Sequence, residues 1–172
     1  HSVLWLGQAH EPARRNLRRE AHARGVKSSR LVFAEYRDSA ADHLARLKLA
    51  DLFLDTVPYN AHATANDALT CGLPVLTCRG GAFAGRVGES LLHALGVPEL
   101  VAESLSDYEV RALTLARDPA ALAAVKAKLA TKRASGPLFD TVRITRNLES
   151  AYTTMWERQR SGLAPVGFAV PG

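Results

Sequence analysis

Small polar side chains gather in one short stretch of the sequence, PYNAHATAND, at residues 58–67. Asn60, His62, Thr64 and Asp67 alternate there with alanines, between an apolar run at 52–54 and a helix-like run that Gly72 closes. The N-terminus of a helix carries unpaired N–H groups and about half a positive charge, so it holds a phosphate well. The alanines would let a phosphate approach the backbone closely, and a histidine could donate a hydrogen bond to it. The stretch therefore predicts a phosphate site.

A second interpretation of the same residues needs no ligand. Thr64 and Asp67 have the spacing of a capping box, in which Thr64 would cap the helix and contribute about 1 kcal/mol. This interpretation gives no role to Asn60 or His62. The residues alone leave both possibilities open.

The elements around this stretch predict the fold class. Short strands, apolar on both faces, alternate with helices, and three further helices follow them. The expected strands are 3–6, 31–33, 52–54, 74–77 and 100–102, and the expected helices are 12–24, 39–49, 64–71, 84–95, 106–116, 119–134 and 140–160. This alternation predicts an α/β fold with a doubly wound, parallel, Rossmann-like sheet and C-terminal helices.

Ligands of such sheets bind at the carboxyl ends of the strands, which here are the loops 35–39, 57–63 and 78–84. His43, in the helix after the second strand, could flank the same crevice as His62. The loop from Gly80 to Arg86 has G-x-x-x-x-G spacing, but Arg86-Val87 replaces the Lys-Ser/Thr of a P-loop. A G-x-G-x-x-G fingerprint is absent, which argues against a dinucleotide site. We expect Gly80 and Gly81 to form a tight turn.

Composition excludes several other classes. Hydrophobic residues make up 47% of the 172 residues, and no apolar run is long enough to span a membrane. The net charge is only +5, and the arginine pairs at 14–15 and 18–19 lack stacking aromatics, so we expect a solvated helix face and no nucleic-acid partner. Cys71 and Cys78 have no metal-ligand spacing and predict reduced thiols of a cytoplasmic protein. The chain opens on His1 instead of methionine, which predicts a piece of a longer protein.

Three segments carry a family resemblance: LADLFLDTVPYNAHATANDALTCGLPVLT, GRVGESLLHALG and SGPLFDT. Their most specific parts are D-T-x-x-x-N-x-H-x-T-x-x-D-x-L and P-L-F-[DN]-T. The chain resembles, from about residue 3 to 156, the C-terminal catalytic lobe of O-linked N-acetylglucosaminyltransferases. These are the SPINDLY-type glycosyltransferases of family 41, which have the GT-B fold. The alanine- and arginine-rich composition predicts a bacterial homologue.

The resemblance implies site residues. His62 corresponds to the family histidine that contacts the diphosphate and donor sugar, so we expect it to stabilise the leaving diphosphate. The other residues implied at the nucleotide and phosphates are His43, Arg46, Ala63, Thr64 and Asp67, with Arg37 and Asp38 in the uracil loop and Tyr59 and Asn60 at the donor sugar. Asn60 has an alternative role, in shaping the turn.

The resemblance also implies a reaction. The family transfers GlcNAc from UDP-GlcNAc to Ser/Thr hydroxyls of proteins, with inversion and without a metal or other cofactor. The catalytic base and the region that recruits the acceptor protein lie in N-terminal parts absent from this chain, so we expect the fragment alone to be inactive. The expected divisions are a nucleotide-sugar-binding lobe over 1–134, a helical segment over 135–160 that packs back on the enzyme, and a loosely ordered tail over 161–172.

Two departures from the family pattern affect the nucleotide. Ala63 stands where animal enzymes have a second threonine, and Ala40 stands where they have a lysine against the nucleoside. The alternatives are therefore a SPINDLY-type O-fucosyltransferase that uses GDP-fucose, or a non-catalytic nucleotide-binding module.

Overall fold

The structure is a computed structural model that describes residues 2–170, and its chain forms two compact units, 1–49 and 50–172. Every strand pair is parallel. The predicted α/β class with parallel strands is thus confirmed. The strands pair within their own unit: the first unit has a sheet of order β1-β2, and the second has a sheet of order β3-β4-β5. No helix in the described part of the chain is both long and apolar enough for a membrane span.

The first unit is a βαβ motif followed by a helix. Its elements are β1 (Leu4–Leu6), α1 (Glu11–Ala23), a 3-10 turn (Ser28–Arg30), β2 (Leu31–Phe33) and α2 (Ala40–Leu47). Leu4 pairs with Leu31 and Leu6 with Phe33. Helix α1 starts with a proline in its first turn, where the missing N–H costs nothing. Helix α2 starts as expected, because the Ser39 side chain accepts a hydrogen bond from the Asp42 N–H at 3.3 Å.

The second unit continues the alternation. Its elements are β3 (Phe53–Leu54), α3 (Ala63–Thr70), β4 (Val75–Cys78), a 3-10 turn (Phe83–Gly85), α4 (Val87–Leu95), a 3-10 turn (Pro98–Leu100), β5 (Val101–Ala102), α5 (Leu105–Arg117), α6 (Pro119–Ser135), a 3-10 turn (Pro137–Phe139) and α7 (Thr141–Arg160). Phe53 pairs with Val75, and Thr77 with Val101.

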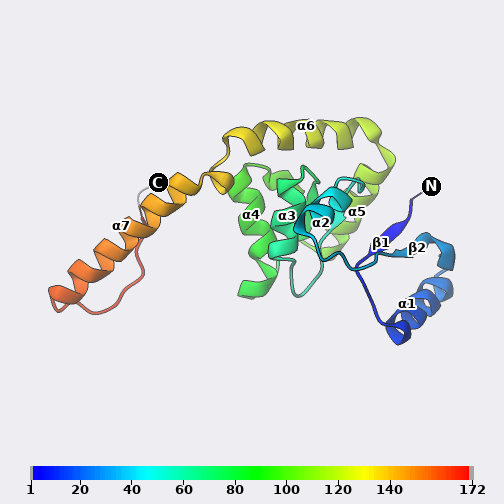
Figure 1. The fold of residues 1–172 in the computed structure, drawn as a ribbon, viewed down its shortest axis with the longest axis horizontal. Helices are drawn as coiled ribbons and strands as arrows, with labels where there is room; N and C mark the ends of the chain where they lie inside the picture. The colour runs from blue at the N-terminus through cyan, green and yellow to red at the C-terminus, as the bar shows by residue number, and fades with distance from the viewer. Residues whose placement is uncertain (1, 171–172) are drawn as a thin grey trace. The chain divides into compact units, whose positions relative to one another are not determined.

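Strand β4 is the centre of the second unit. All four of its residues are buried, so both of its faces are covered, as expected for the central strand of a parallel sheet. Leu69, Leu92 and Leu129, from α3, α4 and α6, are fully buried in the core, and α6 contacts α3, α4 and α5 (Figure 1). This packing fixes where β3 and β4 end and where α3 and α4 begin, which is the region of the predicted phosphate site.

Candidate functional site

The turn after β3 is organised around the buried carboxylate of Asp55, which is 5% exposed. Its Oδ1 accepts hydrogen bonds from the backbone N–H groups of Thr56 at 2.8 Å and Ala61 at 2.7 Å. Its Oδ2 accepts one from the Thr77 hydroxyl of β4 at 2.7 Å. Burial of a carboxylate is costly unless the group is hydrogen-bonded, and here its hydrogen bonds close residues 55–61 into a turn and tie the turn to the central strand.

Asn60 completes the turn from the interior. It is 1% exposed, and its amide Nδ2 donates to the Thr56 carbonyl at 2.9 Å. Its Oδ1 accepts from the Gly88 N–H of α4 at 3.4 Å, and its own N–H donates to the Ala84 carbonyl at 2.8 Å. These bonds match the alternative role, shaping the turn, because a contact with the donor sugar would require this buried amide to leave its partners.

His62 lies where the turn becomes helix α3. It is the N-cap residue, with φ −102° and ψ −90°, and its side chain makes no capping hydrogen bond. The imidazole stacks on the Tyr59 ring, with centroids 4.9 Å apart and an interplanar angle of 15°, and meets Phe83 edge-on at 6.3 Å. Its Nε2 lies 3.4 Å from the Ala84 carbonyl. The ring is therefore held on two sides while remaining partly exposed to solvent.

The interpretation of Thr64 as a helix cap is wrong. Helix α3 begins at Ala63, so Thr64 lies inside its first turn and His62 takes the cap position. The hydrogen bond from Ala61 N–H to Asp55 anchors the chain two residues before α3 begins. Ala63 and Thr64 are both exposed. The N–H groups of a first helical turn have no partner within the helix, so this end of α3 combines N–H groups that the helix itself does not use with a hydroxyl and an imidazole.

The remaining predicted residues fall in two places. Asp67 lies on α3 itself, one turn beyond Ala63. In the first unit, Arg46 donates to the Glu35 carbonyl at 2.6 Å and lies 3.0 Å from Nδ1 of His43, and Arg37 lies 3.7 Å from the Glu35 carboxylate. The structure thus brings His43, Arg46 and the loop that holds Arg37 and Asp38 together. Their expected roles at the nucleoside stay predictions, as do those of Tyr59, His62 and Thr64 at the donor.

Four residues of the site were missed by the sequence analysis. Asp55 and Thr77 are joined across 22 positions of the sequence. A Cβ on Gly88 would lie 2.6 Å from the Thr77 hydroxyl, so this glycine lets α4 approach the pair closely. The Tyr108 hydroxyl of α5 donates to the Asp55 carbonyl at 2.9 Å, and burial, with the charge of Asp55, raises the pKa of Tyr108 to about 12. Two signals were available for Asp55: it directly follows an apolar run, and it opens the motif D-T-x-x-x-N-x-H-x-T-x-x-D-x-L.

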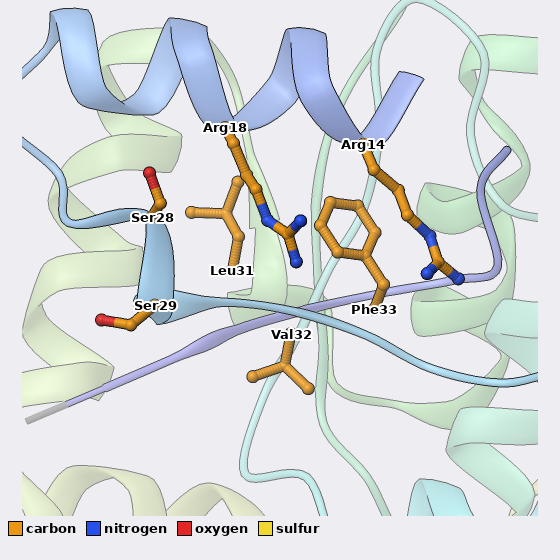
Figure 2. A pocket seen from close by; sticks show the side chains of 7 residues that line it. All are labelled: Arg14, Arg18, Ser28, Ser29, Leu31, Val32 and Phe33. Atoms are coloured by element: carbon orange, nitrogen blue, oxygen red, sulfur yellow. The ribbon is translucent and has the colours of Figure 1, made fainter. Parts of the chain in front are cut away.

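The first unit also contains a cavity of about 610 Å³, beside α1 and β2. The guanidinium carbons of Arg14 and Arg18 lie 5.4 and 5.2 Å from the centre of the Phe33 ring, in cation–π geometry. Figure 2 shows the hydroxyls of Ser28 and Ser29 turned away from both guanidinium groups. The polar groups do not converge, so we assign no ligand here. The predicted solvated face is corrected in part, because Arg14 is half-buried.

A unit of parallel strands alternating with helices belongs to the class of Rossmann-like α/β folds, and here a helix N-terminus, an exposed threonine and a histidine lie at the end of its sheet. Residues 1–148 match the model of glycosyl transferase family 41. The chain belongs to this family of glycosyltransferases.

Sequence and structure relatives agree with this assignment. The chain is 36% identical over 171 residues (99% of this chain, 17% of the relative) to the probable UDP-N-acetylglucosamine–peptide N-acetylglucosaminyltransferase SEC of Arabidopsis thaliana. It is 37% identical over 162 residues (94% and 14%) to the UDP-N-acetylglucosamine–peptide N-acetylglucosaminyltransferase of Caenorhabditis elegans. A mutant O-GlcNAc transferase of Thermobaculum terrenum superimposes with a TM-score of 0.83 at 34% identity, over 90% of this chain and 30% of that one. The predicted GT-B resemblance is confirmed, and the chain spans about a sixth of the length of these curated relatives.

Proposed function

We propose that this chain is the donor-binding lobe of an enzyme that transfers GlcNAc from UDP-GlcNAc to Ser/Thr hydroxyls of proteins, with inversion and without a metal. The observation that carries the proposal is the start of α3, where His62 stacks on Tyr59 and the first helical residues, Ala63 and Thr64, are exposed. The names of the Arabidopsis and Caenorhabditis relatives, which give UDP-N-acetylglucosamine as donor and a peptide as acceptor, support this donor and acceptor class.

The chemistry follows from the charge that develops on the leaving group. When the bond between the sugar C1 and the diphosphate breaks, negative charge accumulates on the phosphate oxygens. The first-turn N–H groups of α3, together with about half a positive charge from the helix dipole, favour that charge. The Thr64 hydroxyl and the His62 imidazole can add hydrogen bonds, while Tyr59, 63% exposed, offers a flat surface to the sugar. The base that accepts the hydroxyl proton and the surface that binds the protein acceptor belong to the N-terminal lobe and lie outside this chain.

We place the enzyme in the cytoplasm.

A second candidate is a SPINDLY-type transferase that uses GDP-fucose. It is favoured by the 41% identity over 125 residues (73% of this chain, 14% of the relative) to a rice protein, the probable UDP-N-acetylglucosamine–peptide N-acetylglucosaminyltransferase SPINDLY, although the name of that relative gives UDP-N-acetylglucosamine as the donor. Ala40, at the position of the animal lysine, leaves the nucleoside contact open to either base. A non-catalytic nucleotide-binding module is the remaining alternative.

Titration calorimetry of the full-length protein with UDP and with GDP tests the proposal. We expect UDP to bind more tightly than GDP, with no requirement for added divalent metal. Tighter binding of GDP would favour the fucosyl donor. Binding of UDP without any sugar transfer or donor hydrolysis would favour the non-catalytic module, and binding of neither nucleotide would refute the site.

A further inference from the structure

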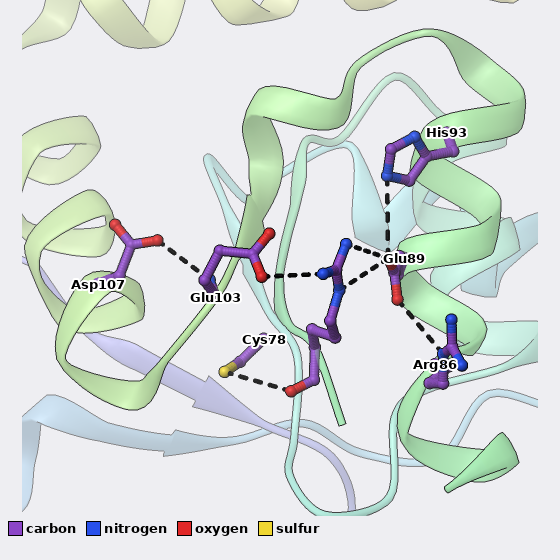
Figure 3. Close-up of polar contacts among 7 residues, drawn as sticks. Cys78, Arg86, Glu89, His93, Glu103 and Asp107 are labelled. Atoms are coloured by element: carbon purple, nitrogen blue, oxygen red, sulfur yellow. Dashed lines mark hydrogen bonds and ion pairs between the residues drawn. The ribbon is translucent and has the colours of Figure 1, made fainter. Parts of the chain in front are cut away.

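Several charged groups near the start of α4 surround one buried carboxylate, that of Glu89. Glu89 is 8% exposed, and its Oε1 receives the Arg79 guanidinium through Nε at 2.8 Å and through the NH2 nitrogen at 2.5 Å (Figure 3). Its Oε2 is shielded from solvent and accepts no hydrogen bond from the described residues; Arg86 Nε lies 3.6 Å from it. His93 Nε2 is 4.0 Å from Oε1. Burial acts to raise the pKa of Glu89, but the Arg79 hydrogen bond and the surrounding positive charges lower it overall, so the group is ionised at neutral pH.

The two arginines stand at the two ends of one loop. Arg79 directly precedes Gly80, and Arg86 directly follows Gly85. The loop is closed between them by the Gly80 N–H, which donates to the Gly85 carbonyl at 2.8 Å. Arg79 is also paired with Glu103, which is 3.0 Å away and exposed. Glu89 is therefore the group that both ends of the loop share.

The same loop forms one wall of the candidate site. The Ala84 carbonyl accepts the Asn60 N–H at 2.8 Å and faces Nε2 of His62 at 3.4 Å. The Phe83 ring meets the imidazole edge-on, and a Cβ on Gly85 would lie 2.7 Å from the Pro58 carbonyl, so the loop fits closely against the turn. We propose that Glu89 is a positioning residue for donor binding: by holding Arg79 and Arg86, it fixes residues 80–85 and thereby the orientation of His62.

Stability alone does not account for this arrangement. An apolar side chain of similar volume in place of a buried ion pair is often neutral or stabilising. Arg79 is 43% exposed at its side chain and retains Glu103, so removal of Glu89 does not leave a buried, unpaired arginine. What the carboxylate adds is a fixed separation of the loop ends, which a methionine of similar size cannot supply.

The test uses Glu89→Met, Glu89→Gln and a matched control, Glu99→Met, in the full-length protein. Glu99 pairs with Lys128 at 2.6 Å and lies away from the loop. We expect Glu89→Met to raise the Kd for UDP about tenfold, Glu89→Gln to raise it about threefold because one acceptor oxygen remains for Arg79, and Glu99→Met to leave it unchanged. The KM for the nucleotide sugar should rise with little change in kcat, and amide hydrogen exchange should increase at residues 80–86 but not in β4.

The proposal rests on the proposed function, and the two fail differently. If the unmodified protein binds UDP and both Glu89 variants bind it equally well, the positioning role is overturned while the function stands. Absence of UDP binding to the unmodified protein overturns both. If Glu89→Met fails to fold, Glu89→Gln decides: unchanged UDP affinity and unchanged exchange at 80–86 would refute the role of Glu89.

Discussion

Gly80 and Gly81 are adjacent in the same loop, yet alanine should be tolerated at only one of them. A Cβ on Gly80 would lie 2.8 Å from the Gly85 carbonyl oxygen and 2.9 Å from the Gly85 Cα, whereas a Cβ on Gly81 would meet no atom within 4 Å. Neither position has a φ in the left-handed region. The difference between the two variants therefore reports steric contact and not backbone conformation.

The cost of Gly80→Ala follows from these contacts. Both neighbours are backbone atoms, so no side-chain rotation can relieve the overlap, and the loop must open. Overpacking of this kind costs about 1–3 kcal/mol, and loss of the hydrogen bond from Gly80 N–H to Gly85 adds about 1 kcal/mol. Opening also moves the Ala84 carbonyl away from His62, and a loss of about 1.4 kcal/mol in nucleotide binding would be a tenfold weaker Kd.

We expect Gly80→Ala to lower the melting temperature of the full-length protein by several degrees and to weaken UDP binding roughly tenfold. Gly81→Ala should match the unmodified protein in both scanning calorimetry and nucleotide titration. Equal melting temperatures and equal affinities for the two alanine variants would refute the close approach of the loop ends.

Four further results are expected. His62→Ala should weaken UDP binding more than His22→Ala, an exposed histidine of α1, and equal Kd values would refute the assignment of His62. Asp55→Ala should lower the free energy of unfolding by about 3–5 kcal/mol, because the buried donors that face the carboxylate lose their acceptor. Asp55→Asn keeps an acceptor oxygen and should lower it less, as measured by denaturant unfolding. A larger loss for Asp55→Asn than for Asp55→Ala would contradict this network. Tyr108 has a pKa raised from 10.0 to about 12, so its contribution to stability is complete below pH 10 and is lost as the pH rises to 12; ultraviolet titration should show one late tyrosine that Tyr108→Phe removes. Finally, the 172-residue fragment alone should show no transferase activity in a radiolabelled donor assay, and turnover would contradict the two-lobe mechanism.

Local patterns in the sequence were sufficient to predict most elements, because glycine stops, an N-terminal proline and apolar runs act over a few residues. Helix α2 begins where the sequence predicted a helix, over 39–49, and Ser39 is its cap. The start of α3 was different: the sequence T-x-x-D suggested Thr64 as the cap, but the helix begins one residue earlier, at Ala63. His62 therefore takes the cap position, directly after the turn that the Asp55 carboxylate closes. The partner of Asp55 on β4, Thr77, is set by strand pairing, which no local pattern contains.

Part of the candidate site could also be predicted from the sequence. His62 stands beside the expected helix start, and capping by Thr64 gave it no role, so it was predicted to contact a ligand. The contact of its ring with Ala84 and Phe83 depends on how the loop after β4 folds back onto the turn after β3. That loop is fixed by Glu89, ten residues beyond Arg79, and charge pairing between a loop and the following helix has no sequence signature of its own.

The way in which the turn after β3 is closed also bears on how this site can evolve. Its shape depends on backbone N–H groups and on two buried side chains, Asp55 and Asn60. Val57 and Tyr59 lie between these two residues in the sequence and are 43% and 63% exposed. Their side chains do not contribute to these hydrogen bonds; the Tyr59 ring stacks on His62. Mutational drift at these two positions can therefore change the exposed rim of the turn while the hydrogen-bonded scaffold beneath it is conserved.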